Sequence, residues 1–376
     1  MGADLMTRKE RMLAAMRRRP VDRVPFSAYN LFPYAGSGHA EDPTYAPLLR
    51  RIEECAGAFA KIGALPPAHG LVRQRPGLLD RRIEGVGDDR VRHTILHTPK
   101  GDLTETTSMP EIKPARVIKP FITSDADIEC FLSLPYEPPE IDMTRARDFC
   151  ASAGDRAVMG IAFAEPMSTI AGLFDFDDFR EHCMTDLPAI LRMEDFAFER
   201  CSEDLRRLVA ACRGLDCVLH TDGPEICTPP AMSPSLFGRL VTPYLSKLAE
   251  IIHGGGLLCG IHCHGRVREI FPEMLKTGAD LLEPIEPPDQ GNIKLAELML
   301  QAKGRISLMG YLQDQDFYTA PPGRMTRKVE DIARVVNGRT GYILSPTGTP
   351  FERPCPEIYA RNYMEWLDAA DRIFNG

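Results

Sequence analysis

The sequence lacks the features that would place it in a membrane or on nucleic acid. Its 376 residues contain no run of about 18 apolar residues, so no membrane-spanning helix is predicted. Lys and Arg number 45 against 53 Asp and Glu, which gives a formal net charge of -8. Nucleic-acid binding needs clustered cations to neutralise phosphates, so this acidic balance argues against nucleic acid as the main ligand. The one basic cluster, Arg17-Arg18-Arg19, is interpreted as the solvated end of a helix.

Targeting signals and paired cysteines are missing as well. The N-terminus carries charges where a signal peptide has its apolar core, and Met6 stands where a myristoylation motif needs Ser or Thr. The cysteines number 11, an odd count, and form no Cys-x-x-Cys pair. This usage is typical of free thiols in a reducing compartment, so we expect a cytoplasmic protein.

The sequence has no nucleotide-binding motif, but it shows a regular alternation of strands and helices. No Gly-x-Gly-x-x-Gly or P-loop pattern follows any expected strand. Short apolar strands separated by amphipathic helices indicate parallel strands that are covered on the outside. The expected strands are 24–29, one within 51–75, 157–163, 217–220, 257–262, 280–285, 305–310 and 341–345. About eight such units predict an α/β fold. They favour a closed (β/α)8 TIM barrel rather than an open doubly wound sheet.

The chain is interpreted as one barrel domain over residues 1–376 with two additions. Residues 1–23 form an N-terminal helical extension, in which Thr7 and Glu10 have the spacing of a capping box. Residues 31–150 are read as a large, irregular insertion after the first strand. Within it, 91–97 and 103–107 have the pattern of a hairpin around Pro99-Lys100-Gly101.

The strongest site candidate is the pair His262 and His264 at the end of a predicted barrel strand, because barrel active sites form at the carboxyl ends of strands. Residues two apart on an extended chain point the same way, so both imidazoles can reach one point. That arrangement predicts zinc, which would need a third protein ligand and an open position for substrate. The alternative is two hydrogen-bonding histidines.

Acids at neighbouring strand ends are the candidates to complete this site. Glu225 and Glu283 are the expected candidates for the third metal ligand. The alternative for each is a structural role, as an acid in a salt bridge at the rim of the barrel. Glu225 and Asp222 are also the expected catalytic acids. Asp222 and His220 could instead orient a metal ligand.

Three further residues are expected to bind substrate, and each has a simpler reading. His220 lies at the end of its strand. Arg266 could hold an anionic group or face solvent at a helix start. Tyr311 could contact substrate or pack over the barrel mouth.

Several segments together resemble uroporphyrinogen decarboxylase-like methyltransferases. They are Thr7-Arg8-Lys9-Glu10-Arg11, Pro20-Val21-Asp22-Arg23-Val24-Pro25, Gly223-Pro224-Glu225, Ser233-Pro234, Gly255-Gly256 leading to His262, Gly278-Ala279-Asp280 and Leu344-Ser345-Pro346. The resemblance covers nearly the whole chain and implies a (β/α)8 barrel. It also implies corrinoid-linked methyl transfer, in which zinc activates a thiol or assists transfer of the methyl group.

The chain differs from the thiol-methylating members at two metal positions. Those members carry His-x-Cys and a distant Cys, whereas here His264 replaces the first Cys and Gly348 stands at the last-strand position. Two neutral imidazoles and a carboxylate leave zinc a stronger Lewis acid than thiolates do. Such a centre suits the oxygen of a methyl ether or an alcohol. The arginine-rich substrate motif of the decarboxylase itself has no counterpart around Phe26 to Tyr34.

The resemblance therefore implies a zinc-dependent methyltransferase of the O-demethylase type. Its methyl donor would be a small methylated substrate, a methyl ether above all, and its acceptor a cobalamin (corrinoid) carried by a separate protein. A homodimer is one possible assembly. The alternatives are a metal-free decarboxylase, which is a lyase, and a non-catalytic barrel that binds a ligand.

Overall fold

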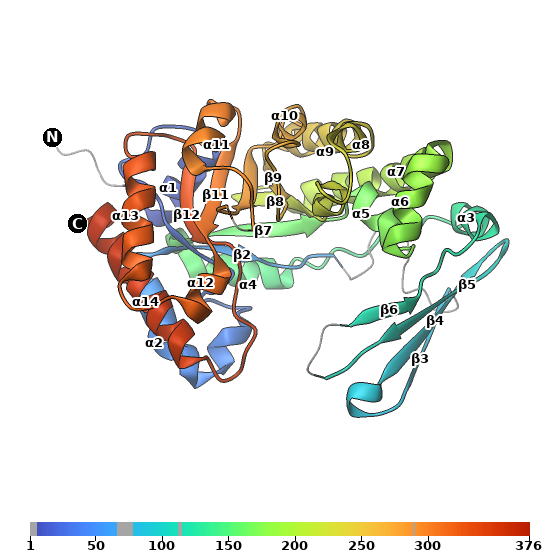
Figure 1. The fold of residues 1–376 in the computed structure, drawn as a ribbon, viewed down its shortest axis with the longest axis horizontal. Helices are drawn as coiled ribbons and strands as arrows, with labels where there is room; N and C mark the ends of the chain where they lie inside the picture. Colours follow the sequence, from blue (N-terminus) through green and yellow to red (C-terminus); the bar gives the residue numbers. More distant parts are fainter. Residues whose placement is uncertain (1–5, 66–77, 112–114, 289) are drawn as a thin grey trace.

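Parallel strands form the centre of the protein. The structure is a computed structural model that describes residues 6–65, 78–111, 115–288 and 290–376. Within these residues eight parallel strands pair in the order β1-β2-β7-β8-β9-β10-β11-β12 (Figure 1). They are β1 (Ser27–Tyr29), β2 (Gly57–Lys61), β7 (Ala157–Phe163), β8 (Cys217–Asp222), β9 (Leu258–His262), β10 (Leu281–Ile285), β11 (Ser307–Leu312) and β12 (Tyr342–Pro346). The backbone N–H of Leu344 donates to the carbonyl of Pro25 at 3.0 Å, joining the last strand to the first. The predicted (β/α)8 barrel is confirmed.

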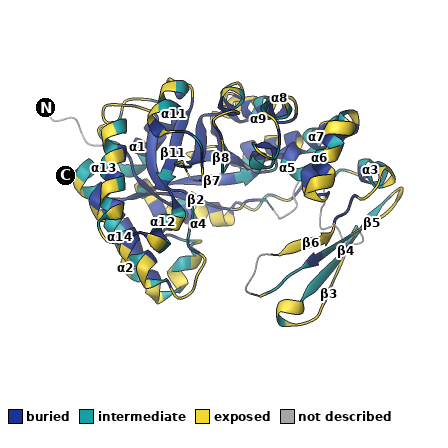
Figure 2. Cartoon of the chain, in the orientation of Figure 1, coloured by how far each residue is buried: buried dark blue, intermediate teal, exposed yellow. Residues whose placement is uncertain are grey.

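Helices cover the outside of the strands, so the strands are buried and the outward helix faces are exposed (Figure 2). The helices are α1 (Arg8–Met16), α2 (Ala46–Cys55), α3 (Asp125–Leu132), α4 (Thr144–Ala153), α5 (Pro166–Ala171), α6 (Phe176–Thr185), α7 (Leu187–Ala211), α8 (Pro234–Leu240), α9 (Thr242–Gly254), α10 (Phe271–Met274), α11 (Leu295–Ala302), α12 (Asp314–Thr319), α13 (Arg324–Val336) and α14 (Glu357–Ala370). Among the described residues, none of these helices is both long enough and apolar enough to cross a bilayer.

Helix α1 closes one end of the barrel. Its capping box forms as predicted: the Glu10 N–H donates to Oγ1 of Thr7, and the Thr7 N–H donates to the Glu10 carboxylate. The apolar face of α1 packs on a ring of interior side chains, one from each strand: Tyr29, Phe59, Val158, Val218, Leu258, Leu281, Met309 and Ile343. The interpretation of Arg17–Arg19 as a solvated helix end is wrong for Arg18, because its guanidinium binds Asp280 at 3.1 Å.

The insertion is a sheet of its own. Strands β3 (Leu79–Glu84), β4 (Val91–Thr98), β5 (Gly101–Ser108) and β6 (Arg116–Lys119) are antiparallel and extend away from the barrel (Figure 1). The predicted hairpin is β4–β5, whose pairing runs to Thr98 opposite Gly101. The span 31–150 also holds α2 and β2, and β2 is the strand expected within 51–75. The sheet therefore follows the second barrel strand, one strand later than expected.

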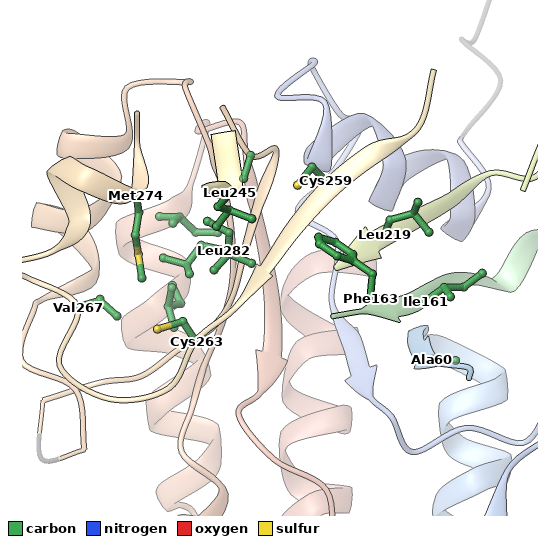
Figure 3. Packing of buried hydrophobic residues seen from close by; sticks show 14 of the residues in the cluster. Ala60, Ile161, Phe163, Leu219, Leu245, Cys259, Cys263, Val267, Met274 and Leu282 are labelled. Atoms are coloured by element: carbon green, nitrogen blue, oxygen red, sulfur yellow. The ribbon is translucent and has the colours of Figure 1, made fainter. Parts of the chain in front are cut away.

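The main core lies between the strands and the helices. Figure 3 shows Cys263, Val267, Met274 and Leu282 in one part of this core. All eleven cysteines lie in the described part of the chain and are free thiols, as predicted. Because side chains alternate along a strand, burying Cys263 outside the barrel leaves His262 directed to the interior.

Candidate functional site

The second interior layer of the barrel is polar. Two residues after the apolar ring, the same inward positions are occupied by Lys61 on β2, His220 on β8 and Glu283 on β10. His262, at the end of β9, is paired with Glu283 in the strand register. The alternation of side chains along the strands therefore places charged groups inside the carboxyl end of the barrel. The opposite end is apolar and is closed by α1.

Lys61, His262 and Glu283, together with Tyr29 of the ring below them, form what we call the inner cluster. The Nδ1 atom of His262 is 3.2 Å from both carboxylate oxygens of Glu283. It is also 3.0 Å from Nζ of Lys61 and 3.3 Å from the hydroxyl of Tyr29. Nζ of Lys61 is 3.4 Å from Oε1 of Glu283. One ring nitrogen is therefore the meeting point of a carboxylate, an ammonium and a phenol.

Glu283 is ionised although its side chain is fully buried. Burial raises the pKa of a carboxyl, but Lys61, His262 and His220 together lower the pKa of Glu283 to about 2. His220, also fully buried, places Nδ1 4.0 Å from Oε1 of Glu283. A buried carboxylate is tolerated here because cationic and hydrogen-bonding groups surround it.

A second imidazole–carboxylate pair, the outer pair of His264 and Glu286, lies beside the first. Nδ1 of His264 is 3.2 Å from Oε1 of Glu286, and the N–H of Gly265 donates to the other carboxylate oxygen at 2.6 Å. Burial lowers the pKa of His264, but Glu286, with Glu225 and Glu283, raises it overall. The rings of His262 and His264 are 4.8 Å apart between centroids, so the two imidazoles lie together as their spacing predicts.

The donor types suit a metal, but the metal site is not already assembled. In the part of the chain that the structure describes, no three His, Cys, Asp or Glu side chains are grouped so as to hold an ion. His262 and His264 instead each present Nδ1 to a separate carboxylate. Metal-ligating histidines are commonly oriented in this way, through one ring nitrogen bound to a carboxylate while the other faces the metal. The two pairs therefore fit a zinc site in donor chemistry.

Glu225 lies in the short turn Pro224–Cys227 after β8 and has spare hydrogen-bonding capacity. Its Oε2 atom is buried and has no hydrogen-bond partner among the described residues. Its charge also acts on His264 and on the buried acid Glu165. Burial raises the pKa of Glu165 to about 7, and the charge of Glu225 adds to that shift.

The remaining predicted residues are placed differently. Asp222 pairs with His262 in the strand register, but its side chain lies outside the described residues. Arg266 is exposed on the loop after β9. The hydroxyl of Tyr311 accepts a hydrogen bond from the N–H of Leu295 at 2.9 Å, which ties it to the start of α11.

Tyr29 and Lys61 are site residues that were not predicted from the sequence. Lys61 ends a strand that was expected within 51–75 without defined bounds, so its place at a strand end could not be recognised. Tyr29 was assigned to the first strand, but its proximity to His262 depends on closure of the barrel. A signal existed for both, since each is a polar side chain at the carboxyl end of a parallel strand.

Comparisons with known proteins agree with this architecture. A family model described as "Uroporphyrinogen decarboxylase (URO-D)" matches residues 104–358. A methyltransferase from Methanosarcina mazei is structurally similar with a TM-score of 0.60 and 15% identity, covering 98% of this chain and 99% of that one. A D-psicose 3-epimerase from Clostridium cellulolyticum H10 gives a TM-score of 0.35 at 9% identity, over 61% of this chain and 82% of that one. The search among curated proteins gives no match.

Proposed function

Because the chain belongs to the uroporphyrinogen decarboxylase family, we propose that it is a methyltransferase of the corrinoid-linked branch. The methyl donor would be a small methylated substrate, a methyl ether above all, and the acceptor a corrinoid on a separate protein. The methyltransferase that shares its fold over nearly the whole chain supports this choice. The observation that carries it is the pair of adjacent imidazoles, His262 and His264, each with a carboxylate at Nδ1.

We propose that this site binds zinc through His262, His264 and one carboxylate. Glu225 is the favoured oxygen ligand, because its buried Oε2 has no other partner in the described structure. Glu283 and Glu286 would then orient the two imidazoles. Zinc would supply Lewis acidity at the substrate oxygen, while the strong nucleophile for the methyl carbon belongs to the corrinoid.

The residues of the chain would hold substrate and charge in place. Glu283 stays ionised through neutral pH and fixes the ring of His262. Glu286, held by the N–H of Gly265, fixes the ring of His264 in the same way. Arg266 is exposed next to this strand end and could bind an anionic group of the substrate. The side chain of His264 is half exposed, so substrate could reach a metal held there.

The first experiment measures zinc per chain in purified wild type, His264→Ala and the control His93→Ala on the antiparallel sheet. We expect about one zinc in wild type and in the control, and little in His264→Ala. Reduced cobalamin or a corrinoid protein is then supplied with methoxylated aromatics, methylated amines and methylated thiols. Methylcobalamin should form with one substrate class and be lost in His264→Ala. Absence of zinc would remove the metal from the proposal, and turnover without a corrinoid would favour a decarboxylase.

A further inference from the structure

Lys61 occupies a position that the proposed metal chemistry does not require. Its backbone is fixed where the N–H donates to Oδ1 of Asn30 at 3.1 Å. Its ammonium lies 3.0 Å from Nδ1 of His262, 3.4 Å from Oε1 of Glu283 and 5.2 Å from the ring centre of Tyr29. The side chain is 20% exposed, so the ammonium lies at the edge of the fully buried carboxylate.

Lys61 and Glu283 make opposite demands on the same nitrogen of His262. An ammonium can only donate, so a hydrogen bond from Lys61 requires the lone pair of Nδ1 and places the ring proton on Nε2. An ionised carboxylate can only accept, so a hydrogen bond to Glu283 requires the proton on Nδ1 and leaves the lone pair on Nε2. The Tyr29 hydroxyl both donates and accepts, and therefore selects neither tautomer. Only the tautomer favoured by Glu283 offers Nε2 as a metal ligand.

We propose that Lys61 is a positioning residue that sets the tautomer of His262 and thereby lowers the affinity of the site for zinc. This inference rests on the proposed function, in which His262 is a zinc ligand. With the ammonium on Nδ1, the ring nitrogen on the opposite side carries a proton and cannot bind an ion. With the ammonium moved away from Nδ1, the imidazole donates to the carboxylate of Glu283 and Nε2 becomes available.

The surroundings of Lys61 permit both positions. The ammonium of Lys61 also contacts the carboxylate of Glu283 and the ring of Tyr29. Lys61 therefore keeps an anion and an aromatic face as partners when it leaves His262. The flexible four-carbon stem of the lysine allows this movement. Zinc binding would therefore be coupled to movement of one side chain while the strands stay fixed.

The test compares wild type, Lys61→Met and the control Lys100→Met, whose lysine pairs with Glu129 outside the barrel. Two quantities are measured: the tautomer of His262 in zinc-free protein, from the chemical shifts of its two ring nitrogens, and zinc affinity, by competition with a chelator. In Lys61→Met we expect the proton on Nδ1 and a zinc affinity raised about tenfold, within the range for groups that orient metal ligands. The control should match wild type in both.

The outcomes separate this inference from the proposed function. If neither variant nor wild type binds zinc, the zinc proposal fails, and the nitrogen shifts still decide whether Lys61 sets the tautomer. If Lys61→Met binds zinc as wild type does and His262 keeps the same tautomer, the inference is wrong and zinc binding stands. Lys61→Gln serves if the Met variant does not fold, because an amide partly replaces the ammonium beside Glu283. It should shift both quantities in the same direction by a smaller amount.

Discussion

Asp314 fills the space beside Gly348. A Cβ atom added at Gly348 would lie 2.9 Å from Cγ of Asp314 and 3.2 Å from its Oδ2, closer than side chains normally pack. Asp314 is itself largely buried, and burial raises its pKa to about 6. Thiol-methylating members of the family carry a cysteine at this last-strand position. In this chain that cysteine and Asp314 cannot both be accommodated without movement.

We therefore expect Gly348→Cys to destabilise the protein without raising zinc affinity at the proposed site. Overpacking of a filled position costs about 1–3 kcal/mol of unfolding free energy. The double variant Asp314→Ala/Gly348→Cys should recover most of this loss, with Asp314→Ala alone as the control. Urea unfolding measures the stability and chelator competition measures the zinc affinity. A Gly348→Cys protein as stable as wild type, with tighter zinc binding, would contradict the steric explanation.

The absence of a side chain at Gly160 makes room for His220. A Cβ at Gly160 would lie 2.7 Å from Cζ of Phe59 and 3.1 Å from Cδ2 of His220. We expect Gly160→Ala to destabilise the fold by about 1–3 kcal/mol and to displace His220 from Glu283. The control is Gly63→Ala, where nothing lies within 4 Å of an added Cβ. Unfolding measurements that show equal stability for the two variants would count against this packing.

The contribution of Glu165 to the stability of the protein should fall as the pH rises from about 4.5 to about 7, because Glu165 holds its proton more tightly in the folded state. Its pKa is raised from 4.5 to about 7 by burial, so the folded state favours the neutral carboxyl and loses this advantage on ionisation. The shift corresponds to about 3 kcal/mol.

Glu165→Gln isolates this contribution. The N–H groups of Met167 and Ser168 donate to separate oxygens of Glu165, and the single amide oxygen of Gln can accept from one of them. We expect the variant to match wild type near pH 4.5 and to be more stable at pH 8, as measured by urea unfolding at both pH values. A difference between the two proteins that does not change with pH would exclude Glu165 as the titrating group.

Local sequence patterns predicted most of the barrel, because each strand and helix has its own hydrophobic period. They also predicted that His262 and His264 lie together, since alternation along a strand is a local rule. The inner cluster could not be predicted in the same way, because Tyr29 and Lys61 reach His262 only across the closed barrel. The structural role of Tyr311 could not be predicted from the sequence either. Its backbone is left-handed, with φ of 83°, and its hydroxyl is bound at the start of α11.

The two candidate carboxylate ligands should respond differently to neutralisation. Oε2 of Glu225 has no hydrogen-bond partner in the described structure, so Glu225→Gln should leave stability almost unchanged while lowering zinc affinity. Glu283 is fully buried and is the partner of Lys61 and His262, so Glu283→Gln removes the charge that balances an ammonium. Breaking a buried ion pair costs about 3–5 kcal/mol, and this ammonium is partly exposed, so we expect the lower end of that range.

Zinc content, chelator competition and urea unfolding of both variants measure these effects together. Glu283→Gln should also weaken zinc binding, because the carboxamide orients His262 less firmly, but only alongside the loss of stability. Full zinc occupancy in Glu225→Gln, with loss of zinc in a stably folded Glu283→Gln, would make Glu283 the ligand. In that case Lys61 Nζ, 3.4 Å from Oε1 of Glu283, would have to leave the carboxylate as well as the imidazole when the metal binds.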